Sequence, residues 1–249
     1  MIGRYELKYI IDSATRASFL REAQHGLIAD PNGQNAIYRV SSVYFDTPDF
    51  SAYWEKLDGE GVRRKYRLRY YTPDSADQEI GTAYMEIKHR VQNTVYKQRV
   101  QLTEAGALAI LNNGQELAEI SKHVAPTPNL DLAAIAEIER AAQHGLEAKT
   151  TITYLREAWL GSVDDRLRLT FDSQGQTYSS DAFARVDSNS GQNFMPDDQI
   201  IMEVKFNQAI PRWIRDVLVK QQLVLHRFSK YAAGVAIPAQ AYMRSLSST

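Results

Sequence analysis

The tripeptide of glutamate, an apolar residue and lysine occurs three times in segments typical of β-strands, at residues 6–8, 86–88 and 203–205. Successive side chains of a strand point to opposite faces, so both charges of each tripeptide lie on one face. The other face is apolar or aromatic in all three segments: Tyr5, Leu7 and Tyr9; Met85 and Ile87; Met202, Val204 and Phe206. We therefore expect strands with one ionic and one apolar face. In a sheet built from such strands, the two faces would lie in different surroundings.

Two further segments show the same alternation with an excess of cations. The ionic faces carry Arg63, Lys65, Arg67 and Arg69 in the first segment, and Arg166, Arg168 and Asp172 in the second. A solvated face of an antiparallel sheet explains any one such pattern by itself. Like charges at successive positions repel each other, however, unless anions lie among them. The joint pattern favours five strands that turn their ionic faces toward a shared lumen.

Composition sets the broad class of the protein. The chain has 249 residues and a formal net charge of −1, so it has the length of one large domain or two small ones, and no overall basic character that would indicate nucleic-acid binding. It contains no cysteine, which excludes disulfides and thiolate metal sites. The sequence shows no leader-like apolar segment and no long apolar run, so we expect a cytoplasmic protein without a membrane span.

The order of predicted elements favours an α+β protein with an antiparallel sheet. After a first strand, Asp12 or Ser13 begins a helix, and Thr103 begins another that reaches residue 111. Further helices are predicted at residues 129–143 and 211–225 and after Ser229. Strands are predicted at residues 38–45, 84–90, 94–102, 150–159, 166–171 and 200–206, with a basic strand after the turn at residues 58–59.

A lumen with these charges suits phosphate chains. Guanidinium groups bind phosphate oxygens with two parallel hydrogen bonds, and lysines add mobile point charges. The glutamates in the same face are explained by a divalent cation that binds carboxylate and phosphate oxygens together, and Mg²⁺ or Mn²⁺ prefers such ligands. Phosphoryl transfer in such a site needs no separate protein nucleophile.

Seven motifs, taken in order, resemble one known family. They are RYELKY at residues 4–9, SVYFDT at 42–47, RKYRLRYY at 64–71, MEIK at 85–88, LTFD at 169–172, MEVK at 202–205 and SKY at 229–231. Together they resemble the VTC domain, the catalytic module of polyphosphate polymerases in the triphosphate tunnel metalloenzyme, or CYTH-like, superfamily. The resemblance implies an antiparallel β tunnel barrel with flanking helices. It also implies a single catalytic domain over residues 1–249.

The resemblance further implies an activity and a set of site residues. A polymerase of this family transfers the terminal phosphate of ATP to a growing polyphosphate chain and releases ADP, with Mn²⁺ or Mg²⁺ as cofactor. The catalytic set would be Lys8, Arg67, Arg69, Lys88, Arg168 and Lys230. The phosphate path would add Lys97, Arg99 and Lys205 to the same six residues. Glu203 would be the main metal ligand, with Glu6 and Glu86 as candidates for metal binding or for holding the cations in place.

Several alternatives stay open at this point. The same cations and metal would also serve a tunnel phosphohydrolase that cleaves triphosphate or short polyphosphate with water. A noncatalytic binder of polyphosphate or nucleotide, and a plain sheet scaffold with charged outer faces, are the other two. Unlike eukaryotic VTC proteins, the sequence shows no SPX-type helical domain, so it resembles a bacterial relative whose product stays in the cytosol or passes to a separate membrane partner.

Overall fold

The chain is described from a computed structural model, which covers residues 4–33, 35–72, 82–92, 94–164, 166–179 and 191–246. The strands are β1 (Arg4–Ile11), β2 (Leu27–Ala29), β3 (Ile37–Asp46), β4 (Val62–Thr72), β5 (Ala83–Val91), β6 (Thr94–Leu102), β7 (Glu147–Gly161), β8 (Arg168–Ser179), β9 (Gln192–Asn193) and β10 (Ile200–Asn207). The helices are α1 (Ser13–Ala23), α2 (Ser51–Leu57), α3 (Glu104–Asn112), α4 (Leu132–Gln143), α5 (Arg212–Lys220) and α6 (Lys230–Leu246), with 3₁₀ turns η1 (Gln24–Gly26) and η2 (Gly114–His123).

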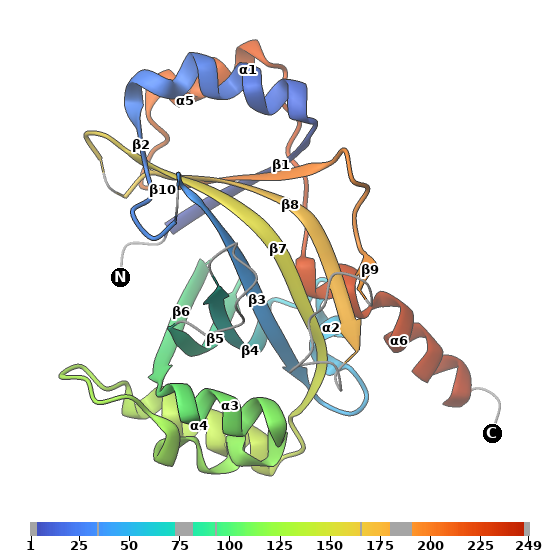
Figure 1. Cartoon of the computed structure of the whole chain (residues 1–249). Helices are drawn as coiled ribbons and strands as arrows, with labels where there is room; N and C mark the ends of the chain where they lie inside the picture. The colour runs from blue at the N-terminus through green and yellow to red at the C-terminus, as the bar shows by residue number, and fades with distance from the viewer. Residues whose placement is uncertain are drawn as a thin grey trace.

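One antiparallel sheet organises the molecule. Its main path follows the order β1, β10, β8, β7, β3, β4, β5, β6, with β2 paired to β7 and β9 paired to β8. The sheet curls so that its two outermost strands, β1 and β6, approach each other (Figure 1). Among the described residues no backbone ladder joins these two strands. The architecture is therefore a half-barrel, and it confirms the predicted antiparallel tunnel fold with flanking helices.

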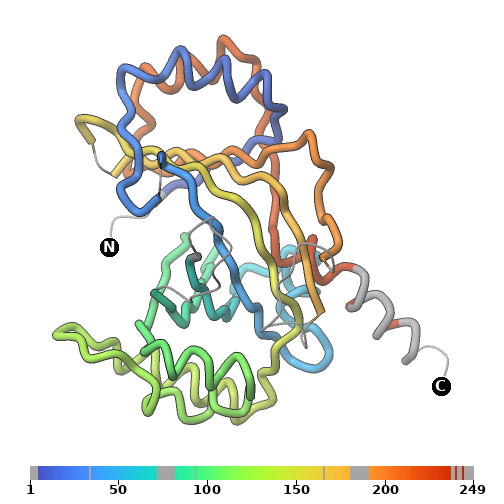
Figure 2. The backbone as a smooth tube through the Cα atoms, viewed as in Figure 1, coloured from blue at the N-terminus to red at the C-terminus, as the bar shows by residue number. Residues whose placement is uncertain are grey.

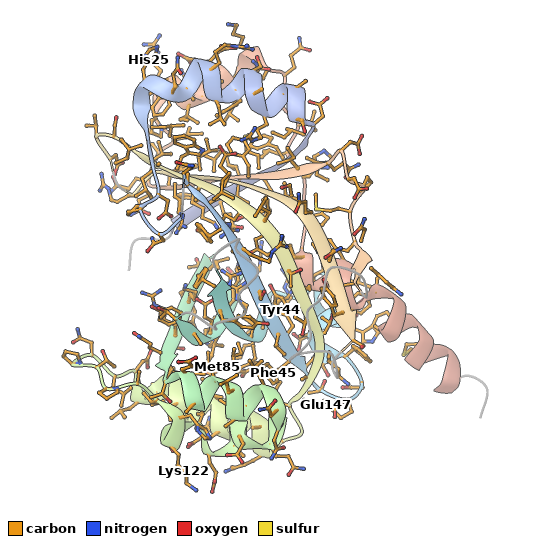
Figure 3. All side chains as sticks on the ribbon, viewed as in Figure 1. His25, Tyr44, Phe45, Met85, Lys122 and Glu147 are labelled. Atoms are coloured by element: carbon orange, nitrogen blue, oxygen red, sulfur yellow. The ribbon has the colours of Figure 1, made fainter. Side chains whose placement is uncertain are left out.

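The outer face of the half-barrel is apolar and is covered by helices at two places. The α3, η2 and α4 segments pack on the outer face of β4, β5 and β6 around Leu68, Met85 and Ile87. Phe45 and Met85 lie next to this helical layer (Figure 3). At the other end of the sheet, α1 and α5 cover β1, β10 and β8 (Figure 2). Burial of these alternate apolar side chains determines which face of each strand turns outward.

The inner face meets α2 and α6 instead. The α6 helix lies against β7 and β8, and Val235 and Ala239 pack there with Ile152 and Tyr154. Gly234 permits this close approach, because a Cβ atom at that position would lie 2.7 Å from Cδ1 of Ile152. The α6 helix thus begins at the open side of the half-barrel and places Lys230 inside it.

The element boundaries follow from local chemistry. Asp12 caps α1 by accepting a hydrogen bond from the Thr15 amide at 2.7 Å, and Thr103 caps α3 through the Gly106 amide at 3.0 Å, as the sequence predicts. Some predicted bounds were wrong. β8 runs from Arg168 to Ser179, not from residue 166 to 171, α4 begins at Leu132, not at residue 129, and α5 ends at Lys220, not at residue 225. The sequence also predicts a hairpin and a loop over the polar residues 172–198, of which residues 180–190 lie outside the described part of the chain.

No helix within the described ranges combines the length and apolar character that crossing a bilayer would require.

Candidate functional site

The ionic faces predicted from the sequence turn inward and meet across the half-barrel. On one wall, strand register places Lys8 of β1, Glu203 of β10 and Thr170 of β8 side by side. On the other wall, it aligns Arg67 of β4 with Glu86 of β5 and Arg99 of β6. A link across the open edge is the ion pair between Lys88 Nζ and Glu6 Oε2 at 3.6 Å. This inward orientation contradicts the scaffold alternative, in which the charged faces would point to solvent.

Glu203 is the centre of the first group of charges. Its Oε1 lies 3.2 Å from Lys8 Nζ and 3.3 Å from Lys230 Nζ, and its Oε2 lies 2.7 Å from Lys205 Nζ. Burial by itself raises the pKa of Glu203, but Lys205, Lys230 and Lys8 outweigh burial and hold it well below its usual value. Burial disfavours the charged form of Lys205 too, and it lowers the pKa of Lys205 to about 8 despite the contact with Glu203. Glu203 is therefore ionised at neutral pH.

Asp172 and Arg156 extend this group, and sequence reasoning did not assign either as a site residue. Arg156 Nε and Nη2 each lie 2.7 Å from an oxygen of Asp172, and Lys230 Nζ lies 2.6 Å from Asp172 Oδ2. Asp172 is fully buried, and Arg156 is only 6% exposed. The available signal was an arginine in the mostly apolar and threonine-rich part of β7 after Lys149, where the only other charge is its neighbour Glu157. A buried cation in such a strand requires a carboxylate or an anionic ligand.

The second group surrounds Glu86, which is 1% exposed. Arg67 binds its Oε2 through Nε at 2.8 Å and Nη2 at 2.6 Å, and Lys97 Nζ lies 2.7 Å from Oε1. Burial raises the pKa of Glu86, but Arg67, Arg69 and Lys97 outweigh burial and lower it strongly. Arg67 also donates to the Tyr44 hydroxyl at 3.1 Å. Glu86 thus orients the cations of β4 and β6.

Arg69 differs from Arg67 in its partners. It is 7% exposed, and it donates to Ser42 Oγ at 3.2 Å and to the Tyr154 hydroxyl at 3.1 Å. No carboxylate among the described residues forms an ion pair with it. The positive charge of a buried guanidinium that has only hydroxyl partners is not neutralised, so it can bind an anion.

The remaining predicted cations lie at the margins of the same face. Arg168 binds Asp30 Oδ2 and the Tyr38 hydroxyl, both at 2.7 Å, and Arg99 lies over the Tyr84 ring at 4.8 Å. Arg166, which the alternation placed on the ionic face, is instead in the turn before β8 and pairs with Asp164 at 2.7 Å. The turn removes this residue from strand alternation, so its expected position on the face was wrong.

Lys65 was not among the predicted site residues. Its Nζ lies 3.1 Å from Ser229 Oγ and 5.0 Å from the centre of the Tyr231 ring. Burial, followed by the charges of Lys88, Arg63, Lys56 and Lys8, lowers the pKa of Lys65 to about 7. The Tyr231 hydroxyl in turn donates a hydrogen bond to Asp46, so Asp46 joins β3 to α6.

The carboxylates fit a divalent cation in their chemistry but are not preassembled around one. Lys8 Nζ lies 2.9 Å from Glu6 and 3.2 Å from Glu203, and Lys230 Nζ similarly joins Glu203 to Asp172. Carboxylate oxygens therefore already converge on positive charge at two points, and they are the hard ligands that Mg²⁺ and Mn²⁺ prefer. Glu86 lies apart, with Arg67 and Lys97. Within the described residues no group of three or more metal-ligating side chains is arranged to hold an ion.

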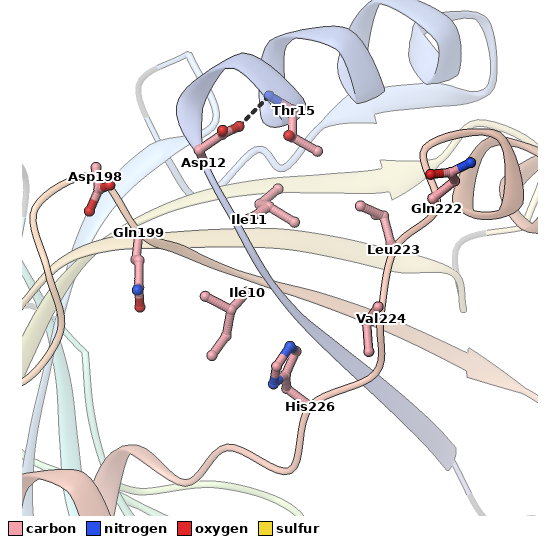
Figure 4. Close-up of a pocket in the computed structure, with 10 residues that line it drawn as sticks. All are labelled: Ile10, Ile11, Asp12, Thr15, Asp198, Gln199, Gln222, Leu223, Val224 and His226. Atoms are coloured by element: carbon pink, nitrogen blue, oxygen red, sulfur yellow. Dashed lines mark hydrogen bonds between the residues drawn. The ribbon is translucent and has the colours of Figure 1, made fainter.

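A separate pocket lies between the end of β1, the start of α1 and the segment after α5 (Figure 4). It has a volume of about 400 Å³. The described residues that line it include Asp12, Asp198 and several apolar side chains, but no lysine or arginine. This pocket therefore lacks the cations that a phosphate chain requires.

The fold and its inner face define a class: a curled antiparallel half-barrel with helices on its outer face and charged side chains in its lumen. Two solved structures share the fold. A candidate adenylate cyclase from Bacillus halodurans is 12% identical, covers 92% of this chain and 96% of its own, and superposes with a TM-score of 0.52. A candidate adenylyl cyclase from Hippeastrum, described as having a dominant triphosphatase activity, is 12% identical with a TM-score of 0.52 and covers 95% of this chain and 96% of its own.

The family follows from the sequence match. The VTC domain profile matches residues 3–238, and the chain therefore belongs to the VTC domain family. Vacuolar transporter chaperone complex subunit 4 of Schizosaccharomyces pombe is 26% identical in an alignment 245 residues long, and the aligned part of this chain is 84% of its length. The alignment spans 33% of that relative, so this chain corresponds to about a third of its length.

Proposed function

We propose that this protein is an ATP-dependent polyphosphate polymerase, which transfers the terminal phosphate of ATP to a growing polyphosphate chain. The observation that carries the proposal is the inner face itself. Among the described residues, cations from seven strands and from the start of α6 face one lumen, and they outnumber the carboxylates among them. Membership of the VTC domain family supports the particular reaction.

In the proposed site, the phosphate path follows the cations of both walls. Arg67 and Arg69 would bind phosphate oxygens on the β4 side, and Lys8, Lys205 and Lys230 on the opposite side. Lys88, Lys97, Arg99 and Arg168 would extend the path toward the margins. Arg156 joins the proposed set because its guanidinium is held rigidly by Asp172 beside Lys230. Arginines fixed in place before the ligand binds, as Arg156 is by Asp172, stabilise charge on the transferring phosphate without reorganising.

Glu203 is the proposed main metal ligand, with Glu6 beside it. Glu86 is proposed to hold Arg67 and Lys97 in position, because both of its oxygens are already bound by these cations. A bound Mn²⁺ or Mg²⁺ would neutralise charge on the phosphate oxygens during transfer. Lys8 and Lys230 would then move their contacts from the carboxylates toward the phosphates.

The proposed reaction breaks the bond between the β–γ bridging oxygen and the γ-phosphorus of ATP. A terminal oxygen of the polyphosphate chain forms the new bond to that phosphorus, and ADP leaves with the bridging oxygen. The side chains named above position both ends in line and need not form a covalent intermediate. Water as the acceptor would give the phosphohydrolase alternative with the same residues.

Incubation of the purified protein with ATP and Mn²⁺ tests the proposal and separates the alternatives. Long-chain polyphosphate together with ADP is the expected product. Orthophosphate released from tripolyphosphate, without polymer formed from ATP, would instead establish the hydrolase. Glu203→Gln should abolish turnover, as should removal of divalent metal by a chelator. If the wild-type protein binds polyphosphate without any metal-dependent turnover, it is a noncatalytic binder.

We further propose that the chain acts in the cytoplasm on ATP and polyphosphate, with no nucleic-acid ligand. A separate membrane partner would receive the product if polyphosphate leaves that compartment. The proposal that residues 1–249 act as one catalytic domain belongs with these predictions. Each follows from the resemblance and from the charge distribution, and activity of the isolated chain in the ATP assay tests the last of them directly.

A further inference from the structure

The cations of β4 and β5 continue beyond the residues assigned above to the phosphate path. Strand register pairs Lys65 with Lys88, and Lys88 with Lys97 on β6. One step further toward the end of the sheet, it pairs Arg63 with Arg90. Like charges directly opposite each other in an antiparallel sheet destabilise it. In the first row, Lys88 pairs with Glu6 and Lys97 with Glu86, whereas the row of Arg63 and Arg90 has no carboxylate partner among the described residues. The Arg63–Arg90 row therefore indicates a ligand that supplies negative charge.

Within the part of the chain that the structure describes, Arg63 and Arg90 have only neutral hydrogen-bond partners. Arg63 Nη1 lies 3.4 Å from the backbone carbonyl of Glu55, and Arg90 Nε lies 2.9 Å from the carbonyl of Gln92. Both residues are half-buried, and no carboxylate of the described residues forms an ion pair with either guanidinium. Glu55 and Glu60 influence Arg63 only at longer range. The Nη groups of Arg90 therefore remain available to an anion.

The two margins of the charged face differ in this respect. At the margin formed by β8, Arg168 is neutralised by Asp30, which is 2% exposed. At the margin formed by the start of β4 and the end of β5, Arg63 and Arg90 keep uncompensated charge. A chain of phosphates that runs along the cations of β4 and β5 would meet positive charge continuously to this second margin.

We propose that Arg63 and Arg90, together with Lys65, form an outer subsite that binds the part of a linear polyphosphate chain extending from the lumen at the start of β4. This inference rests on the proposed function for the identity of the ligand. It adds a direction: long polyphosphate leaves across the ends of β4 and β5, not past Arg168. A short phosphate chain that fits between the inner cations would not reach Arg63 and Arg90.

Binding of two probes of different length tests the subsite. The test variant is the double substitution Arg63→Gln and Arg90→Gln. The matched control is Arg64→Gln, because Arg64 is on the same strand but on the opposite face, where it pairs with Glu137 of α4 at 3.2 Å. Affinities for tripolyphosphate and for long-chain polyphosphate are measured by calorimetry, and thermal unfolding establishes that all three proteins are folded.

The expected result is length-dependent. The double variant should bind long-chain polyphosphate about five- to thirtyfold more weakly than wild type, the loss of two partly exposed charge contacts, and with a weaker dependence on salt. Its affinity for tripolyphosphate should stay unchanged, and Arg64→Gln should change neither affinity. Equal losses for both probes, or no loss beyond that of the control, would overturn the subsite.

The outcomes also separate this inference from the proposed activity. A length-dependent loss of binding in a protein that makes no polymer from ATP would retain the subsite and reject the polymerase. Polymer synthesis by the wild type, combined with unchanged long-chain affinity in the double variant, would retain the polymerase and reject the subsite. A wild-type protein that binds neither probe would overturn both.

Discussion

The buried contact of Asp172 with Arg156 and Lys230 gives a prediction whose size follows from the structure. Asp172→Asn keeps the shape of the side chain and one acceptor oxygen but removes the negative charge between two cations. Both cations are at least nine-tenths buried, since Arg156 is 6% exposed and Lys230 is 8% exposed. Removing one partner of a buried ion pair typically costs about 3–5 kcal/mol, because the remaining charge stays buried without compensation.

The ionisation state of Asp172 supports this magnitude at neutral pH. Burial by itself raises the pKa of Asp172, but Arg156 and Lys230 outweigh burial and lower it below its ordinary value. A lowered carboxyl pKa means that the stabilisation is fully present above the ordinary value, and that it is lost as pH falls through the lowered pKa. Wild type and variant should therefore differ most near neutral pH and converge in acid.

Urea unfolding and thermal unfolding at neutral pH measure the effect. A loss of about 3–5 kcal/mol corresponds to a decrease in Tm of roughly 6–20 °C for a chain of this size. The matched control is Asp164→Asn, which removes the same charge from an exposed pair with Arg166 and should change the stability far less, because solvent screens an exposed pair. Equal stability of the two variants would refute the argument that this buried charge cluster depends on Asp172.

Two further predictions concern binding and turnover. Arg69→Gln should lower turnover about a hundredfold, since it removes a fixed charge from the proposed phosphate path. The variant should still fold, because no carboxylate is left unpaired. Full activity, measured beside the outer-face control Arg64→Gln, would remove Arg69 from the site. Burial and then the neighbouring cations lower the pKa of Lys65 to about 7, and a bound phosphate chain favours the protonated ammonium, so binding should take up a proton above that pH and weaken as pH rises. Calorimetry of long-chain polyphosphate binding in buffers of different ionisation enthalpy measures that proton, and the same uptake by Lys65→Arg, which keeps its charge, would contradict the assignment.

Much of the sheet could be predicted from the chain alone. Alternation in β1, β5 and β10 correctly placed Glu6, Glu86 and Glu203 on ionic faces, because side-chain direction in a strand is local and has a period of two. The same rule was wrong at Arg166, since the rule holds only where the backbone is extended and a turn precedes β8.

The site was less accessible to sequence reasoning. Arg156 and Asp172 are 16 residues apart on neighbouring strands, and the run around Arg156 indicates a buried strand without indicating a partner. Lys65 was recognised as part of a basic face, yet its position under Tyr231 depends on how α6 packs against β7. Contacts of this kind require the register of the sheet and the path of the last helix.

By itself, the amino-acid sequence determined that several strands would each have an ionic and an apolar face, since this depends only on the alternation of neighbouring side chains. The tertiary structure alone decided which charges meet: Glu6 with Lys88 across the open edge, Asp172 with Arg156 and Lys230, and Arg63 beside Arg90. The physical reason is that curling of the sheet brings together residues far apart in the chain, and the energy of a charge depends on the neighbours it meets there.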